Sequence, residues 1–270
     1  MPSSTAATKR PSLRQVTRSP QYFTNVIQIV EEIASARDAS RAVELLQQAT
    51  QRMGAEVSIF VSFVPEDRSR ASYRLLVACD PRFVVEYAAQ ARYRDDPWLE
   101  HARHHALAVR GSELKTSSEA QRSLVRLAER FGFRSSVVVP APSRTGLTRA
   151  SVLCFGSSVP DYFEGEGYGA FKLLAHSVAL EFHEWWLARM RDELIAQAQI
   201  DEEDRRLLAL QAEGRTSKQI ARDLSVSIAC VDSHIRRIRR RLDVPTRHAA
   251  ARLALEYGLI DPLKSQRSDS

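Results

Sequence analysis

The sequence has few cysteines, and the three that it has form no pattern. Cys79, Cys154 and Cys230 are scattered over 270 residues, without the CxxC pair or even set that would predict a zinc finger or a disulfide scaffold. Long apolar runs are also missing. No stretch approaches the roughly 20 residues that cross a bilayer, and the N-terminus lacks the hydrophobic core of a signal peptide. We therefore expect a cytoplasmic protein that does not enter a membrane.

Signatures of catalysis are scarce as well. The sequence contains no GxSxG elbow, Gly-rich phosphate loop or paired catalytic carboxylates. His101 and His105 have the i, i+4 spacing of metal ligands, with His104 between them, but no carboxylate or cysteine completes a convincing site, so a solvated surface is the favoured interpretation. We expect no enzyme, no metal site and no cofactor.

The charge that is present is unevenly distributed. Lysine and arginine together number 39 and acidic residues 33, which gives a net charge of +6. Residues 215–252 contain ten basic residues against three acidic ones, and the first 20 residues contain four basic residues and no acid. The rest of the chain is mildly acidic. Such a local basic segment predicts a nucleic-acid-binding module joined to a neutral one.

The N-terminal region predicts an α/β domain, an α-β-α sandwich, over residues 21–190. Apolar residues recur at helical spacing over 22–53, with Asp38 placed to cap a second helix. Runs rich in β-branched residues then predict at least four strands, at 56–64, 73–79, 135–140 and 151–156. Helical segments follow the second strand, at 83–91 and 119–131, and a long one runs from 163 to about 190.

The segments that flank this domain are expected to be simple. Residues 1–20 predict a flexible basic tail, either a solvated leader or a weak phosphate-contacting arm. Residues 191–200 predict a linker or an extension of the preceding helix. Residues 263–270 are expected to form a second tail.

Residues 201–262 predict a second, smaller all-α domain. Its helical segments cover 202–211, 216–224, 227–242 and 246–257. Thr216 or Ser217 can cap the second of these helices and Ser227 the third, with a tight turn between them, which is typical of a helix-turn-helix. In the third helix the apolar residues recur in steps of four, three and four and mark a buried stripe, so that basic side chains lie outside it and could enter the major groove. The stripe consists of Val231, Ile235, Ile238 and Leu242.

Residues 201–260 resemble the LuxR-type helix-turn-helix over their whole length. Matching positions include Gly214, Ile220, Val231, His234 and the ending Gly258, Leu259, Ile260. The resemblance implies that Asp232, Ser233 and Arg236 face base edges, and it implies phosphate contacts for Thr216, Lys218, Arg237 and Arg240. Relatives often have a basic or polar residue at the position of Asp232, so this aspartate predicts an altered base preference, towards a cytosine amino group.

The segment FVVEYAAQARYRDDPWLEHA resembles the acyl-homoserine-lactone-binding domain of the quorum-sensing LuxR regulators. An amphipathic signal needs an apolar cavity with a few fixed polar groups, and a buried carboxylate can accept the hydrogen of its amide. Asp96 is the candidate acceptor, although a plain turn residue before proline is the alternative. Candidate ligand contacts are Phe83, Tyr87, Asp96, Pro97, Trp98 and Ser151, and core packing is an equal alternative for the three aromatic residues.

The same region departs from the family pattern at three positions. Phe83 stands where the family usually has a tryptophan that binds the lactone carbonyl, and phenylalanine has no donor. A second family tryptophan aligns near Gly111, and a family glycine aligns at Ser136. These changes indicate a reshaped cavity for an acyl-homoserine lactone or another amphipathic signal, or an orphan receptor without its own synthase.

Together these observations predict a ligand-responsive transcriptional regulator, with an activator of the quorum-sensing type as the favoured form. The resemblance implies a homodimer on palindromic double-stranded DNA, with RNA polymerase as a further partner. The alternatives are a ligand-independent regulator or antiactivator that acts through protein contacts, and an enzyme that uses the α/β domain.

Overall fold

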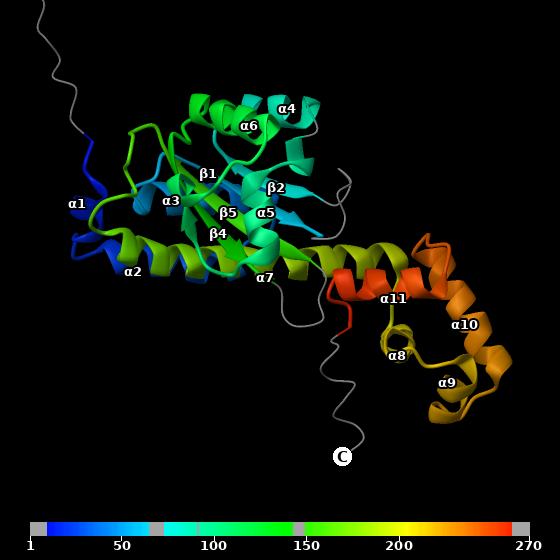
Figure 1. The fold of residues 1–270 in the computed structure, drawn as a ribbon. Helices are drawn as coiled ribbons and strands as arrows, with labels where there is room; N and C mark the ends of the chain where they lie inside the picture. Colours follow the sequence, from blue (N-terminus) through cyan, green and yellow to red (C-terminus); the bar gives the residue numbers. More distant parts are fainter. Residues whose placement is uncertain (1–9, 65–72, 91, 143–148, 261–270) are drawn as a thin grey trace, which may run out of the picture. The chain divides into compact units, whose positions relative to one another are not determined.

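The computed structural model describes residues 10–64, 73–90, 92–142 and 149–260, which form two compact units. The first unit contains most of the chain up to Phe182, and the second contains most of the chain from His183 onward. The first is an α/β domain and the second is helical (Figure 1), so the predicted fold class is confirmed. The expected tail at 263–270, the last two residues of the expected all-α domain and the first nine residues of the expected basic tail lie outside the described residues.

A five-stranded sheet forms the centre of the first unit, in the order β2-β1-β5-β4-β3. The predicted strands are present, and they are β1 (Val57–Phe63), β2 (Arg74–Ala78), β4 (Ser135–Ala141) and β5 (Ala150–Ser157). The fifth, β3 (Val109–Arg110), has only two residues. Strands β4 and β5 are antiparallel, with Val138 opposite Cys154, and β3 is antiparallel to β4.

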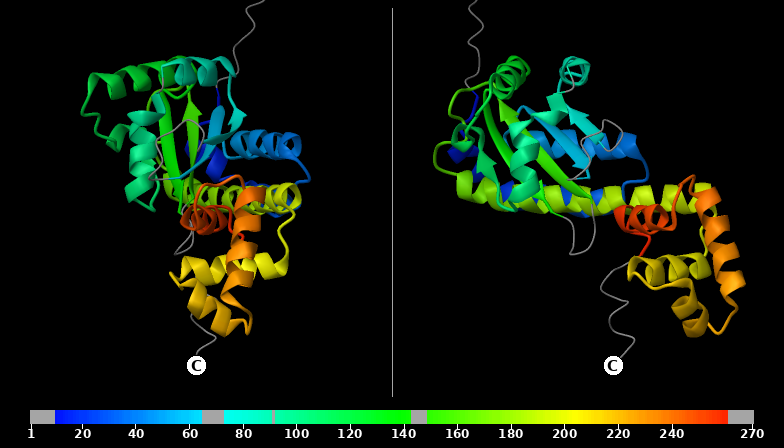
Figure 2. Two further views of the ribbon diagram at one scale, coloured as in Figure 1. Left: turned by 90° about the vertical axis from the view of Figure 1, so that its right-hand side faces the viewer. Right: turned by 45° about the vertical axis from the view of Figure 1, so that its right-hand side comes forward.

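Helices cover both faces of this sheet (Figures 1 and 2). One face carries α2 (Tyr22–Ala34), α3 (Ala39–Arg52) and α7 (Tyr168–Ala198). The other carries α4 (Arg82–Ala89), α5 (Pro97–His104) and α6 (Glu119–Arg130), with the short 3-10 helices η2 (Arg92–Arg94) and η3 (Gly111–Glu113). The predicted cap is confirmed, because the Asp38 carboxylate accepts from the Arg41 N–H at 2.9 Å.

Successive side chains of a strand point to opposite faces of the sheet, and this alternation places the core. Phe60 of β1 and Phe155 of β5 point to the α7 face, where their rings pack against Phe182 and Phe171. The alternate residues of both strands therefore point to the face that α4 and α5 cover. A cavity lies on that side.

The expectation of a flexible tail is wrong for the described residues 10–20. Ser12 caps a short helix, α1 (Leu13–Thr17), and the Leu13 side chain is buried. Arg10 forms an ion pair with Glu56, and its guanidinium donates to the Gly54 carbonyl at 2.8 Å. These contacts are distant in sequence, so local composition could not predict them. They attach the segment to the sandwich.

Residues 191–200, predicted as a linker or a helix extension, mostly continue the preceding helix. Helix α7 runs without interruption to Ala198. Its sequence beyond Met190 consists largely of helix formers, and the interpretation as a helix extension is the correct one. No helix in the described ranges combines the length and apolar character that crossing a bilayer requires.

The second unit contains α8 (Glu202–Ala212), α9 (Ser217–Asp223), α10 (Ile228–Arg241) and α11 (Arg247–Glu256). The predicted caps are present, since the Thr216 and Ser227 hydroxyls accept from the backbone of Gln219 and Cys230. The predicted stripe of α10 is buried in the core of this unit. The α9–turn–α10 pair is therefore a helix-turn-helix.

Candidate ligand pocket and nucleic-acid interface

A small apolar cavity lies between the sheet and the helices α4 and α5. Its volume is about 30 Å³, enough to hold water but small for a ligand pocket. Most of its wall is aliphatic or aromatic. The lining residues are Ile59 and Val61 of β1, Leu75 of β2, Phe83, Val84 and Tyr87 of α4, Asp96, Trp98 and Leu99 around the start of α5, and Val152 and Cys154 of β5.

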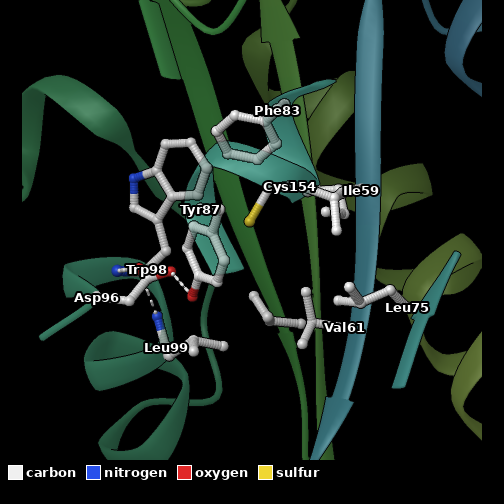
Figure 3. Close-up of a pocket in the computed structure, with 11 residues that line it drawn as sticks. Ile59, Val61, Leu75, Phe83, Tyr87, Asp96, Trp98, Leu99 and Cys154 are labelled. Atoms are coloured by element: carbon white, nitrogen blue, oxygen red, sulfur yellow. Dashed lines mark hydrogen bonds between the residues drawn. The ribbon is translucent and has the colours of Figure 1, made fainter. Parts of the chain in front are cut away.

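Asp96 is the buried carboxylate of this wall (Figure 3). As the N-cap of α5, its Oδ1 accepts from the N–H groups of Trp98 at 2.7 Å and Leu99 at 3.3 Å. Its Oδ2 accepts from the Tyr87 hydroxyl at 2.7 Å. An ionised carboxylate has about four acceptor positions. Three are occupied, so one is left for a further donor.

Burial sets the ionisation of the polar groups around this cavity. It raises the pKa of Asp96 above its ordinary value, although hydrogen bonds from Tyr87 and from the α5 backbone oppose the rise. Burial, followed by the nearby Asp96 carboxylate, holds the pKa values of the Tyr87 hydroxyl and the Cys154 thiol well above their ordinary range. Both therefore stay protonated at neutral pH, and Tyr87 remains a donor.

Phe83 belongs to an aromatic cluster at one end of the cavity. Its ring centroid lies 5.9 Å from that of Tyr87, 5.7 Å from Phe131 and 5.6 Å from Phe133. Trp98 joins the cluster through Phe133, at 5.4 Å. These rings pack against one another as core residues, and Phe83, Tyr87 and Trp98 also line the cavity.

Two predicted contact residues do not line the cavity. Pro97 is the first residue of α5 and fixes the chain beside Asp96. Ser151 alternates with Val152 and Cys154, which do line it, so its side chain is on the opposite face of the sheet with Phe155. The predicted strand is present, but Val152 and Cys154 face the cavity in place of Ser151.

Gly111 and Ser136, the other two positions that depart from the family pattern, lie next to each other. A Cβ atom added to Gly111 would lie 2.2 Å from the Ser136 Oγ. A side chain at position 111 is therefore incompatible with the serine where it stands. Neither residue lines the cavity, so these two changes form a local packing pair between η3 and β4.

An arginine near the cavity is absent from the sequence-based prediction. The Arg103 side chain, on α5, is 4% exposed, and it donates to the Tyr73 hydroxyl at 3.0 Å and to Glu100 at 3.2 Å. Its charge lowers the pKa of Asp96, against the larger effect of burial. The sequence signal is weak, because an arginine on an amphipathic helix is usually solvated.

His101 and His104 lie on α5 and His105 is its C-cap. The rings of His101 and His105 stack at 4.6 Å, and His104 contacts Glu100 at 3.1 Å. Across the described ranges, no three His, Cys, Asp or Glu side chains are grouped in a way that could hold an ion.

The exposed face of α10 is strongly basic. Asp232, Ser233, Arg236, Arg237 and Arg240 are all exposed. Within the described chain, none of these three arginines has a carboxylate partner, whereas Arg215 is held by Glu213 and Asp223 at 2.8 Å. Unpaired guanidinium groups on one face of a helix can bind phosphates and guanine edges.

Two predicted phosphate contacts lie at the start of α9. Lys218 is exposed. Thr216 is exposed as well. Its hydroxyl donates to the Gln219 side chain at 2.9 Å, so this hydroxyl is already engaged in capping the start of α9. The residue between them, Ser217, donates to Asp232 at 2.7 Å, a contact that sequence reasoning missed.

A buried ionic network supports α10 from behind. Asp204 of α8 is fully buried, and its two oxygens contact His234 at 2.8 Å and Arg241. Burial alone would raise the pKa of Asp204, but the hydrogen bonds from Arg241, the Asp201 backbone and His234 lower it overall. The network connects α8 to His234 and Arg241 of α10.

The fold and these two sites define a transcriptional regulator with a sensor-type α/β domain and a DNA-binding helix-turn-helix. Residues 38–184 match the autoinducer binding domain, and residues 202–254 match the bacterial regulatory proteins of the luxR family. The chain belongs to this LuxR family of autoinducer-binding transcriptional regulators.

Individual relatives are distant. The transcriptional activator proteins AhyR of Aeromonas hydrophila and AsaR of Aeromonas salmonicida are each 21% identical over 249 residues, which cover 88% of this chain and 92% of theirs. The crystal structure of Escherichia coli SdiA has a TM-score of 0.68 at 17% identity, covering 88% of this chain and 98% of that one.

Two further solved structures are of proteins described with a small molecule, one as a complex and one as dependent on its signal. SdiA in complex with octanoyl-rac-glycerol has a TM-score of 0.68 at 17% identity and covers 90% of this chain and 98% of that one. The N-acylhomoserine lactone dependent factor CepR2 of Burkholderia cenocepacia has a TM-score of 0.54 at 13% identity, and covers 63% of this chain and 98% of that one. At these identities the structures support the fold.

Proposed function

We propose that this chain activates transcription in response to an amphipathic acylated signal, an N-acyl-homoserine lactone or a related molecule, which binds in the cavity of the first unit. The observation that carries the proposal is the Asp96 carboxylate, buried in an apolar wall with one acceptor position left. A ligand amide or hydroxyl group can donate to that position, while an acyl chain contacts Ile59, Val61 and Leu75.

The cavity must expand for this to happen. Ligand pockets of drug-sized molecules measure about 300 to 1,000 Å³, far more than the cavity of about 30 Å³. The Tyr87 and Trp98 side chains flank Asp96 (Figure 3), and their movement would open the space beside the carboxylate. Ligand binding then completes the core of this unit and stabilises it.

For the second unit we propose binding to a palindromic operator as a homodimer, with α10 in the major groove and RNA polymerase as a further partner. The free arginines of α10 support this proposal. The operator implies that the protein acts in the cytoplasm. Arg236→Ala should abolish preference for the operator selected from randomised duplexes, and unchanged discrimination in a binding titration would contradict the base-reading role.

The ligand itself is best identified from the purified protein. We expect organic extraction and mass spectrometry to recover an acylated small molecule from the wild type and less of it from Asp96→Asn. The matched control is Asp95→Asn, because Asp95 is the adjacent carboxylate and is exposed. In a reporter strain, Asp96→Asn should weaken the dose response to added acyl-homoserine lactone while Asp95→Asn should not.

The second candidate is a ligand-independent regulator or antiactivator that acts through protein contacts. The small cavity and the lack of a donor on Phe83 favour it. A protein that carries no extractable molecule, is dimeric and binds its operator equally with and without acyl-homoserine lactone would support this alternative and contradict the signal-responsive one.

A further inference from the structure

A chain of hydrogen bonds crosses the second unit and ends at the exposed carboxylate of Asp232. Ser217, the first residue of α9, donates from its Oγ to Asp232 Oδ1 on α10 at 2.7 Å. Arg247, the first residue of α11, donates from Nη1 to the same Ser217 Oγ at 3.0 Å. With its amide oxygen turned towards Arg247, the buried Gln211 of α8 accepts from this guanidinium at 2.8 Å. All four helices contribute one side chain.

The direction of these bonds follows from the donors available. A guanidinium has only donors, so the hydrogen between Arg247 and Ser217 belongs to the arginine. The single hydroxyl hydrogen of Ser217 is then left for Asp232. The second oxygen of this carboxylate, Oδ2, has no hydrogen-bond partner among the described residues. One oxygen is therefore held and the other is free on the exposed face of α10.

Without Ser217, the carboxylate has a different partner within reach. Arg236 lies four residues further along α10, and oppositely charged side chains at this spacing pair on a helix surface. In the structure no ion pair joins these two residues, which are both described and both exposed. A pair between them would occupy the carboxylate and the guanidinium at once, and neither would then be free to contact a base.

We propose that Ser217 is a positioning residue for DNA sequence selection. It holds Asp232 in a base-reading orientation and keeps it away from Arg236, so that both side chains stay available to bases. The free carboxylate oxygen can only accept, which suits the amino group of cytosine and disfavours the acceptors of guanine and thymine, while Arg236 suits guanine. Arg247 fixes Ser217 in turn. This inference rests on the proposed DNA-binding function.

The test is a selection from a randomised duplex library with the full-length protein. We expect the wild type to select a cytosine and a guanine in each half-site. Ser217→Ala should lower the preference for both bases, each by about tenfold, the value of a good base contact. Ser217→Thr retains the hydroxyl and should restore both preferences. Asp232→Ala should lose the cytosine preference alone.

The double variant separates positioning from a structural role. If Ser217 acts through Asp232, then adding Ser217→Ala to Asp232→Ala should cause no further loss, because contacting residues are not additive. A further loss in the double variant, or unchanged preferences in Ser217→Ala, overturns the inference while the wild-type operator stands. A wild type that selects no sequence contradicts the proposed DNA-binding function itself.

Discussion

At the scale of single residues, Asp96 shows how a helix cap can also form part of a binding wall. Asp-Pro is a common way to open a turn or a helix, and the structure uses it in this manner, since Asp96 caps α5. The same carboxylate is buried beside the cavity and contacts Tyr87. The turn residue and the ligand acceptor are thus not exclusive interpretations.

The cap and the buried charge can be separated by two substitutions. Asp96→Asn keeps a good N-cap, so we expect a free energy of unfolding within about 1 kcal/mol of the wild type. Asp96→Ala loses the cap and the partner of the Tyr87 hydroxyl, and should cost about 1 to 3 kcal/mol. Urea denaturation checks both values. Equal destabilisation of the two variants would contradict the capping role.

The raised pKa of Asp96 also predicts how the stabilities of the wild type and of Asp96→Asn depend on pH. The folded state favours the protonated carboxyl, so this group contributes stability in acid that is lost as the pH rises from its ordinary value of 3.8 through the higher pKa of the folded state. Asp96→Asn lacks this loss. Its stability relative to the wild type should therefore rise with pH over that window and then become constant, as measured by urea denaturation at several pH values.

At the scale of elements, the sequence predicts those helices and strands whose signal is local. β-branched runs mark four strands, and Asp38, Thr216 and Ser227 mark helix starts as N-caps. β3 escapes prediction because two residues are too few to show a period. The orientation of Ser151 escapes it because alternation alone does not say which set of residues points to the cavity.

Helix α1 escapes prediction for a different reason, because its stability comes from distant partners. Leu13 is its buried residue, and Arg14 and Arg18 pair with Glu166 at 3.0 and 3.3 Å. We expect Leu13→Ala to lower the free energy of unfolding by about 2 to 5 kcal/mol, as for other buried leucines. Gln15→Ala removes only the exposed bonds that the Gln15 side chain accepts from Ser12 at the start of the helix, and it should cost less than half as much. Equal effects of the two variants would indicate that α1 is not packed.

The pairing of these N-terminal arginines also argues against a phosphate-contacting arm. Removing one side chain that binds a phosphate should reduce the salt dependence of DNA affinity by about one unit of slope. Arg237→Ala and Arg240→Ala on α10 should each do so, whereas Arg14→Ala and Arg18→Ala should leave the slope unchanged. Fluorescence anisotropy at several salt concentrations measures the slope, and a lower slope in the N-terminal variants would restore the arm hypothesis.

At the scale of the whole molecule, the net charge is +6, and the basic residues are paired differently in the two units. The first unit holds its basic N-terminal segment in ion pairs with Glu56 and Glu166, while in the described part of the second unit Arg236, Arg237 and Arg240 of α10 have no carboxylate partner. The charge pattern and the family resemblance are enough to predict a basic DNA-binding module joined to a neutral sensor. The cavity wall is not predictable in the same way, because its residues come from β1, β2, α4, α5 and β5, which only the fold brings together.

This division predicts opposite behaviour for one variant in each unit. A ligand that binds only the folded first unit stabilises it by RT ln(1 + [L]/Kd), about 2.7 kcal/mol at a concentration of 100 Kd. Arg236→Ala should keep this stabilisation in full and lose operator discrimination. Asp96→Asn should lose most of the stabilisation and, in the absence of ligand, bind a non-operator duplex as the wild type does.

Calorimetry with added acyl-homoserine lactone measures the stabilisation, and hydrogen exchange read by mass spectrometry locates it. Protection should rise in β1, α4 and α5, whose side chains form the cavity wall. Equal protection in α8 to α11 on ligand binding alone would show that the binding energy is shared with the second unit, and the assignment of the signal response to the first unit would then be wrong. Loss of ligand stabilisation in Arg236→Ala would also contradict this assignment, because Arg236 belongs to the second unit.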